Sequence, residues 1–171
     1  MSLKIRLAQP QDIAPLMAIE RSAAELFRSL PQWAFLADSE GLSAEQHGEF
    51  IRQQSEWLAQ DGTAVVGFIA VQRHDDAWHI AELSVATDYQ RRGIGRQLLA
   101  KVIDVARCAS VPQLTLTTFR NVPWNAPYYC SLGFETIAST ALSATLRSVM
   151  AHEAKQGLPL GSRCAMNFTL S

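Results

Sequence analysis

The segment LSVATDYQRRGIGRQLL, residues 83–99, constrains the fold most, because it runs directly from a strand pattern into an amphipathic helix pattern. The loop between the two patterns contains two glycines and three nearby arginines: Arg91, Arg92, Gly93, Gly95 and Arg96. Glycine lets the backbone approach a ligand closely, and N–H groups at a helix N-terminus attract anions together with the helix dipole. The pattern therefore predicts a binding site for a diphosphate.

The rest of the chain alternates between strand patterns of period two and helical patterns, without repeats or low-complexity segments. We expect strands at about residues 3–7, 56–60, 63–73, 78–85, 114–119, 134–138 and 163–170. We expect helices at about residues 10–24, 43–51, 94–109, 127–133 and 143–155. Seven strands and about five helices in mixed order predict an α/β sheet covered by helices on both faces.

The charge balance, 15 basic against 16 acidic residues, disfavours a general nucleic-acid binder or a polybasic membrane anchor. The longest apolar stretch, residues 64–71, is far shorter than the roughly eighteen residues of a membrane span. No apolar segment typical of a secretion signal follows Lys4 and Arg6. We therefore expect a cytoplasmic protein that has neither a nucleic-acid nor a membrane partner.

The charges are distributed unevenly along the chain. Residues 1–89 include six basic and thirteen acidic side chains, whereas residues 90–171 include nine basic and three acidic ones. Either the halves interleave in space and the asymmetry has no function, or the protein has separate sites for an anion and a cation.

Cysteine and histidine spacing predicts no metal site and no disulfide framework. The three cysteines, Cys108, Cys130 and Cys164, form no CxxC pair, so we expect buried free thiols in a reducing compartment. The four histidines lack metal-binding spacing such as HExxH.

Three general interpretations of the glycine loop can be compared on its residues. A P-loop requires Gly-Lys-Ser/Thr after the glycines, which is absent. A dinucleotide-binding fingerprint requires a small residue where Leu98 stands, and an acidic residue about twenty positions later, where residues 113–120 offer none. A simple turn before a helix gives no reason to gather three arginines.

The loop resembles the coenzyme A loop of the GNAT superfamily of N-acetyltransferases, Gln/Arg-x-x-Gly-x-Gly/Ala, in its residues Gln90-Arg91-Arg92-Gly93-Ile94-Gly95. The family also places a tyrosine ahead of a Gly-Phe pair, as in Tyr129-Cys130-Ser131-Leu132-Gly133-Phe134 here. The order of expected elements agrees with the family over nearly the whole chain. The resemblance is silent on the subfamily.

The resemblance implies a mixed, twisted, seven-stranded sheet in which the strand ending at Val85 and the strand at 114–119 separate. Acetyl-CoA would bind in that wedge as co-substrate. The implied cofactor-binding residues are Leu83, Ser84, Val85, Gln90, Arg91, Arg92, Gly93, Ile94, Gly95, Arg96 and Asn125.

The chain departs from the family at one asparagine. The family often has Asn seven residues before the tyrosine, where this chain has Val122, whereas Asn121 and Asn125 lie eight and four residues before it. Either asparagine could contact the cofactor, and Asn125 could instead cap the short helix that begins near Pro127.

Acetyl transfer to an amine requires a base, stabilisation of the carbonyl oxygen and an acid for the leaving thiolate. The resemblance implies that Tyr129 is this acid; the alternative is that Tyr129 is only a core residue. It also implies that a backbone N–H near Val85 polarises the thioester. Glu82 shares a strand face with Ile80 and Ser84, so partial desolvation would raise its pKa towards that of a base. Alternatively Glu82 pairs with an arginine or faces solvent.

The family selects the acceptor with its first two helices and the loop between them, here residues 22–54. This stretch has five acidic residues and two arginines, together with Trp33 and Phe35, which suits a cationic amine. Alternatively, these charged residues lie on solvent-facing helix surfaces and the two aromatic residues belong to the core.

We expect acetylation of a small primary amine. The alternatives are acetylation of a protein lysine or peptide N-terminus, and a non-catalytic coenzyme A sensor; an aminoacyl-tRNA acetylating toxin is disfavoured by the charge.

The expected organisation is one N-acetyltransferase domain over residues 1–171. Its acceptor-selecting helices lie at about 10–54, its acetyl-CoA core at about 56–140, and a C-terminal helix and strand at 143–170. An exposed edge of the final strand, 163–170, would be a place for two sheets to pair, so we also expect a homodimer.

Overall fold

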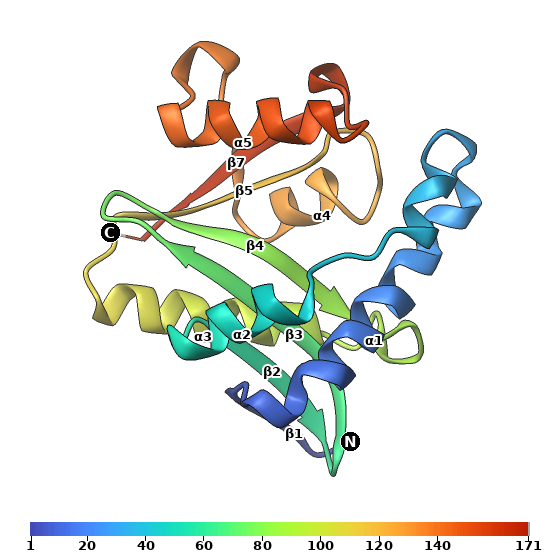
Figure 1. Cartoon of the computed structure of the whole chain (residues 1–171). Coiled ribbons are helices and arrows are strands. Elements are labelled where there is room, and N and C mark those ends of the chain that lie inside the picture. The colour runs from blue at the N-terminus through green and yellow to red at the C-terminus, as the bar shows by residue number, and fades with distance from the viewer. Residues whose placement is uncertain (171) are drawn as a thin grey trace. The chain divides into compact units, whose positions relative to one another are not determined.

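The computed structural model describes residues 1–170, in which seven strands form one sheet in the order β1-β2-β3-β4-β5-β7-β6 (Figure 1). The strands are β1 (Leu3–Leu7), β2 (Glu56–Asp61), β3 (Ala64–Arg73), β4 (Trp78–Val85), β5 (Gln113–Phe119), β6 (Glu135–Thr136) and β7 (Arg163–Thr169). The α-helices in this range are α1 (Ile13–Ala24), α2 (Ala44–Arg52), α3 (Ile94–Cys108), α4 (Ala126–Ser131) and α5 (Ala144–Lys155). Ser171, the last residue of the expected domain, lies outside the described residues.

The sheet is mixed, which confirms the expected fold class. β4 and β5 are parallel, whereas β1–β2, β2–β3, β5–β7 and β6–β7 are antiparallel. The chain forms two compact parts, the first made of residues 1–73 and 80–105, the second of residues 74–79 and those from 106 onwards.

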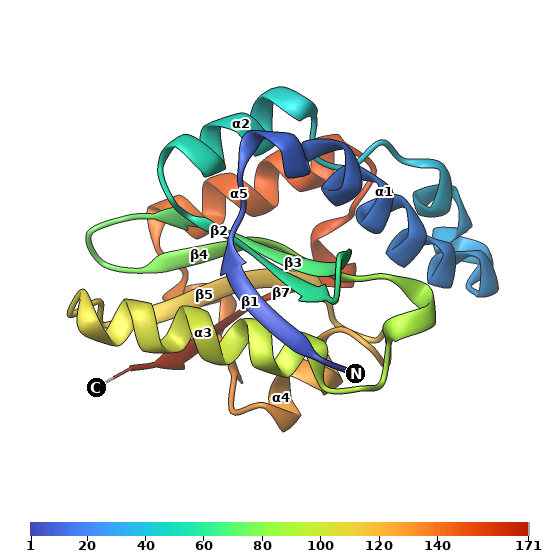
Figure 2. The same ribbon diagram turned by 90° about the horizontal axis from the view of Figure 1, so that it is seen from below.

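In the first part, α1 and α2 cover one face of the sheet and α3 covers the other (Figure 2). The α1–α2 face is filled by buried apolar residues from strands and helices: Leu16, Ile19, Phe50, Leu58, Phe68 and Ala70. On the opposite face, a Cβ added to Gly67 would lie 3.3 Å from side-chain atoms of Ile94 and Leu98. Both faces of β3 are therefore covered, which explains the apolar run at residues 64–71 of this strand.

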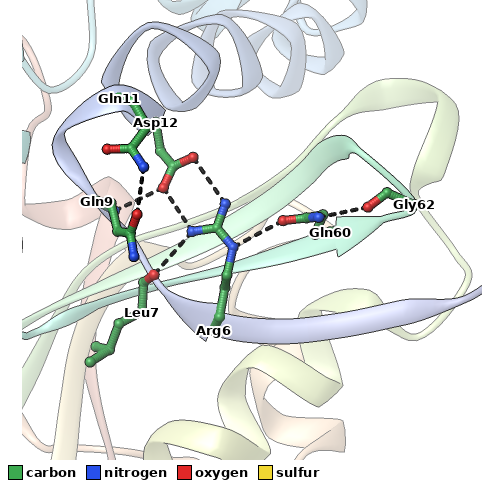
Figure 3. Close-up of polar contacts among 7 residues, drawn as sticks. All are labelled: Arg6, Leu7, Gln9, Gln11, Asp12, Gln60 and Gly62. Carbon is green, nitrogen blue, oxygen red and sulfur yellow. Dashed lines mark hydrogen bonds and ion pairs between the residues drawn. The ribbon is translucent and has the colours of Figure 1, made fainter.

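An ion pair fixes the chain between β1 and α1 (Figure 3). The Arg6 guanidinium donates to both carboxylate oxygens of Asp12, at 2.8 and 3.0 Å, and to Gln60 Oε1 at 2.9 Å. Asp12 also accepts the Gln9 backbone N–H. The hydrogen bond from Arg6 holds the pKa of Asp12 below its ordinary value.

The hairpin between β2 and β3 turns one residue later than expected. Asp61 pairs with Ala64, so the two turn residues are Gly62 and Thr63 rather than Asp61 and Gly62. A register shift between Ala59 and Gln60 changes the alignment of the strands at this point. Gly62 has φ +59, a conformation that glycine adopts without steric strain.

In the second part, α5 and α4 lie on opposite faces of the β5–β7–β6 sheet (Figure 2). Leu146 and Met150 of α5 pack against Ala165. On the α4 side, the rings of Phe134 and Phe168 lie 5.4 Å apart between centroids.

Two expectations about this part were wrong. The strand expected at 134–138 is limited to Glu135–Thr136, because Gly133 precedes it with φ +103 and a short 3₁₀ helix follows at Ser139–Ala141. The final strand was expected to have an exposed edge. Instead β7 pairs with β5 over its whole length, and its other edge pairs with β6 at Met166 and Asn167. The reason given for a dimer therefore does not hold.

The three cysteines are free thiols, as expected, but their burial differs from the expectation. Cys164 is buried, whereas Cys108, at the end of α3, and Cys130, on α4, are exposed. Within residues 1–170, no helix has the length and apolar character that crossing a membrane requires.

Candidate functional site

The loop after β4 has a left-handed backbone at two positions. Arg91 has φ +62 and Gly93 has φ +79. The first is uncommon for a residue with a side chain and is a mark of functional loops. The Gln90 side-chain amide donates to the Val85 carbonyl at 3.0 Å, so the loop is held against the end of its strand.

The loop opens directly onto the N-terminus of α3. The first hydrogen bond between residues four apart in α3 runs from the Gln97 N–H to the Gly93 carbonyl, at 3.1 Å. The N–H groups of Ile94, Gly95 and Arg96 precede this bond and have no acceptor within the helix. Apart from the two neighbouring residues, no atom of the described residues lies within 4 Å of the position that a Gly93 Cβ would occupy. The helix start is therefore accessible to an anion.

Positive charge surrounds this helix start. Arg91, Arg92 and Arg96 are all exposed, and none of them takes part in an ion pair within residues 1–170. The guanidinium of Arg92 lies 5.1 Å above the ring centroid of Tyr89. These arginines therefore have the charge and the exposure that binding a phosphate requires, and their contact with one stays a prediction.

A tether that the sequence does not reveal joins this loop to α1. The Thr87 N–H donates to Ser22 Oγ at 3.0 Å, and the Thr87 hydroxyl donates to the Ser22 carbonyl at 2.7 Å. Nothing in the spacing of the two residues, 65 apart in the chain, indicates this contact.

The predicted face of β4 is confirmed. Ser84 Oγ donates to Glu82 Oε1 at 2.9 Å, which places both side chains on one side of the strand. Ile80 and Ser84 are buried and Glu82 is half-buried. The role of Glu82 as a base, and the contacts of Leu83, Ser84 and Val85 with a cofactor, stay predictions.

Tyr129 lies on α4 in the second part, where aromatic neighbours fix its ring. Its centroid is 5.5 Å from that of Tyr128 and 5.7 Å from that of Phe134, both in edge-to-face geometry. The side chain is half-buried, so it is neither a fully enclosed core tyrosine nor a mobile surface residue.

Asn125 occupies the N-cap position of α4, but its side chain does not cap that helix. Its Oδ1 accepts hydrogen bonds from Thr118 Oγ1 at 2.6 Å and from the Phe119 N–H at 3.3 Å, at the end of β5. The capping alternative was therefore wrong, and the amide nitrogen is the group left for a cofactor. Asn121 is exposed.

The acceptor-selecting stretch is less acidic than its composition indicates. Arg28 pairs with Glu25 and Asp38, and Arg52 pairs with Glu49. Within residues 22–54, the exposed carboxylates that have no ion-pair partner among the described residues are those of Glu40 and Glu45.

The two aromatic residues proposed for the acceptor lie on the 3₁₀ helix Pro31–Asp38. Their ring centroids are 6.3 Å apart. Phe35 is 51% exposed and Trp33 is half-buried, so neither belongs to the main apolar cluster.

A buried titratable cluster underlies α1 and α2, and the sequence gives no signal for it. His47 Nδ1 lies 2.7 Å from Glu56 Oε1, and both side chains are fully buried. Among the described residues, His47 Nε2 and Glu56 Oε2 have no hydrogen-bond partner. Burial raises the pKa of Glu56, against the lowering effect of His47, and burial likewise raises the pKa of Glu20, whose Oε1 accepts the Leu42 N–H.

Comparison with known proteins identifies the family. A family model described as an acetyltransferase (GNAT) domain matches residues 52–136. The fold is similar to that of the PaiA N-acetyltransferase from Thermoplasma acidophilum in complex with coenzyme A, with 15% identity, a TM-score of 0.73 and 99% of each chain covered. It is also similar to the ribosomal-protein-S18-alanine N-acetyltransferase from Escherichia coli, with 18% identity, a TM-score of 0.69, and 99% of this chain and 95% of that chain covered.

A third similar structure is the N-acetylglutamate synthase from Neisseria gonorrhoeae complexed with coenzyme A and N-acetyl-glutamate. The identity is 20% and the TM-score 0.74, and the match covers 100% of this chain but 36% of that one. The region matched by the family model includes β4, the 90–96 loop, α3 and the Gly133-Phe134 pair. The chain therefore belongs to the GNAT superfamily of acetyltransferases.

Proposed function

We propose that this protein transfers an acetyl group from acetyl-CoA directly to the primary amine of a small molecule. The observation that supports this most is the start of α3. Three N–H groups without an acceptor in the helix and three exposed arginines without a carboxylate partner gather there within residues 1–170. Such a site fits the pyrophosphate of coenzyme A. The bound coenzyme A in the Thermoplasma and Neisseria structures supports the same ligand.

The chain's own residues would divide the chemistry as follows. The bound thioester supplies an activated acetyl group. Residues 90–96 hold the pyrophosphate, and the Asn125 amide nitrogen is a further polar contact. Glu82, half-buried and hydrogen-bonded to Ser84, accepts the ammonium proton through a water. Tyr129, whose ring is fixed by Tyr128 and Phe134, donates its phenolic proton to the thiolate and recovers it from solvent.

We propose a small amine as the acceptor. Among residues 1–170 the exposed carboxylates of Glu40 and Glu45 have no ion-pair partner, and together with the exposed ring of Phe35 they are groups of residues 22–54 that suit a compact cation. The structural neighbours are named for both kinds of acceptor, an amino acid and a ribosomal protein. The acceptor must therefore be decided by turnover with a panel of amines and peptides.

Thermal melting with acetyl-CoA, coenzyme A, NAD and NADP tests the anion site before any acceptor is known. A ligand at one hundred times its Kd stabilises by about 2.7 kcal/mol, which raises the Tm by roughly 5 to 11 °C in a chain of this length. We expect this rise with acetyl-CoA and coenzyme A alone. Arg96→Ala should reduce it, whereas Arg147→Ala, an exposed arginine on α5, should not. A larger rise with NAD would overturn the assignment.

Turnover separates an enzyme from a coenzyme A sensor. The acceptors to compare are spermidine, lysine methyl ester and a peptide that begins with alanine. We expect the small amines, and not the peptide, to cause release of the free thiol of coenzyme A from acetyl-CoA. Tyr129→Phe should lower kcat by about 100-fold and leave coenzyme A affinity unchanged, while the neighbouring Tyr128→Phe should leave both unchanged. Binding without turnover of any acceptor would identify a sensor, and preference for the peptide would identify a protein acceptor.

A further inference from the structure

The second part of the chain contains a cavity of about 320 Å³ that lies at the starts of β4 and β5 rather than at the end of β4, where residues 83–85 lie. Four of its polar lining residues come from strands, His79, Gln113, Thr115 and Asn167, and Ser143 and Thr145 are polar as well. Its apolar lining residues include Ile137, Ala138, Ala141 and Leu146. A volume of this size is at the lower end of the range for small-molecule sites.

One nitrogen of a buried histidine is left for this cavity. His79 is 5% exposed, and its Nδ1 lies 2.9 Å from Thr115 Oγ1. Within residues 1–170 its Nε2 has no hydrogen-bond partner, yet it is not among the fully enclosed polar atoms. In a neutral imidazole one ring nitrogen donates a hydrogen bond and the other accepts one. Whether Nδ1 donates to Thr115 Oγ1 or accepts from it, Nε2 therefore has the other role and is available to a ligand.

A pair of amides supplies the matching groups. Asn167 Nδ2 donates to Gln113 Oε1 at 3.0 Å. This bond leaves Asn167 Oδ1 as an acceptor and Gln113 Nε2 as a donor beside the cavity. A planar amide edge in a ligand, with an adjacent N–H donor and carbonyl acceptor, complements this pair and also satisfies either tautomer of His79.

The charges exclude an ionic ligand at the buried end. Among residues 1–170, no lysine or arginine lines the cavity, and its charged or titratable lining residues besides His79 are His74 and Asp76, both at exposed positions. Glu153, which acts on His79 electrostatically, is already paired with Arg163 at 3.1 Å. An ion buried against His79 would therefore lack a counter-charge.

We propose that this cavity, none of whose described lining residues belongs to the 90–96 loop, binds a small uncharged molecule through a planar amide edge. A primary carboxamide and the lactam edge of a nucleobase share this chemistry. The site does not depend on acetyl transfer, since all its lining residues lie in residues 74–79 and 113–167.

The test uses imidazole ¹⁵N shifts in the full chain without coenzyme A, so that it stands or falls apart from the acetyltransferase proposal. Fragments of about ten heavy atoms bind such sites with Kd near 1 mM. We expect a saturable shift of His79 Nε2 with nicotinamide or with uracil, the two sources of an amide edge. Nicotinate, which replaces the amide by a charge, should give none, and exposed His152 should not respond.

Asn167→Asp replaces the amide with a nearly isosteric carboxylate and should weaken the nicotinamide or uracil response at least tenfold. Asn121→Asp, at an exposed asparagine, should have no effect. No shift of His79 with either amide at about 10 mM, or equal shifts with nicotinate, would overturn the proposal without the need for any variant.

Discussion

Thr87 and Ser22 are joined by several hydrogen bonds, which connect the loop after β4 to α1. Thr87 donates through its backbone N–H and its hydroxyl, to Ser22 Oγ at 3.0 Å and to the Ser22 carbonyl at 2.7 Å, and the two hydroxyl oxygens are 2.9 Å apart. The anion loop and the helix of the expected acceptor region thus share one polar junction.

We expect Ser22→Ala to weaken acetyl-CoA binding. The substitution removes the acceptor of the Thr87 N–H, which should lower the free energy of unfolding by about 1 kcal/mol. Because Thr87 lies just before residues 90–96, the KM for acetyl-CoA should rise about threefold to tenfold. Ser29→Ala, whose hydroxyl contacts only the Leu26 carbonyl among described residues, is the control. A loss of stability with unchanged KM would show that the junction is structural alone.

Gly62, in the β2–β3 turn, is a matched control for Gly93 of the anion loop. Both have positive φ, +79 and +59, and neither has an atom within 4 Å of its would-be Cβ. Alanine at either position should therefore lower the free energy of unfolding by a similar amount, about 1 kcal/mol, through backbone strain alone.

Only the change in the loop should affect ligand binding. We expect Gly93→Ala to raise the Kd of coenzyme A at least tenfold, because a methyl group would stand where the phosphate approaches the helix start. Gly62→Ala, in the β2–β3 turn, should leave the Kd unchanged. Calorimetric titration of both variants measures this, and equal Kd values would mean that Gly93 serves only the turn.

Interactions within a few residues were predictable from the sequence, and contacts between distant segments were not. The spacing of Ser43 and Gln46 predicts a capping box at the start of α2, and both of its hydrogen bonds are present, because the two partners lie in one turn. The glycine loop and the start of α3 were predictable for the same reason, because they are neighbours in the chain. The Ser22–Thr87 junction and the buried His47–Glu56 pair instead depend on how α1 and α2 pack on the sheet, which spacing does not encode.

Burial was hardest to predict where an element ends at the surface. Cys108 was expected to be buried, but it is the last residue of α3, where the apolar face has already ended. The position of β7 inside the sheet, which removed the basis for a dimer, depends on the short strand β6. The sequence predicts a strand at residues 134–138, but its pairing with β7 joins distant segments, which the periodicity of either strand does not encode.

The His47–Glu56 pair should show strong coupling in a double-mutant cycle. Each single change, His47→Leu or Glu56→Leu, leaves the other polar group buried without its partner and should destabilise by about 3 kcal/mol. The double variant should be much less destabilised than the sum, since no unpaired group is left. Urea denaturation of the four proteins measures the coupling.

The exposed Glu49–Arg52 pair on the surface of α2 is the control cycle and should show no measurable coupling. Additive effects at His47 and Glu56 would contradict the prediction, because they would mean that neither side chain stabilises the other in the interior.

The pH dependence of stability should include a specific contribution from His79. Burial lowers the pKa of its imidazole to about 4, with a raising effect from Glu153 and a smaller lowering effect from His74. In the unfolded chain the pKa is that of an ordinary histidine, about 6.5. The unfolded state therefore binds the proton first, and stability is lost as the pH falls from about 6.5 to about 4.

The expected loss is about 3 kcal/mol over this window, and His79→Gln should remove it. The measurement is the free energy of unfolding of the two proteins at several pH values between 4 and 7, compared as a difference so that the other titrating groups cancel. The difference curve should be flat above pH 6.5 and slope below it. His152→Gln, at an exposed histidine of α5, should give a flat difference throughout. A flat curve for His79→Gln as well would mean that water reaches the imidazole, and it would remove the uncharged wall on which the amide site depends.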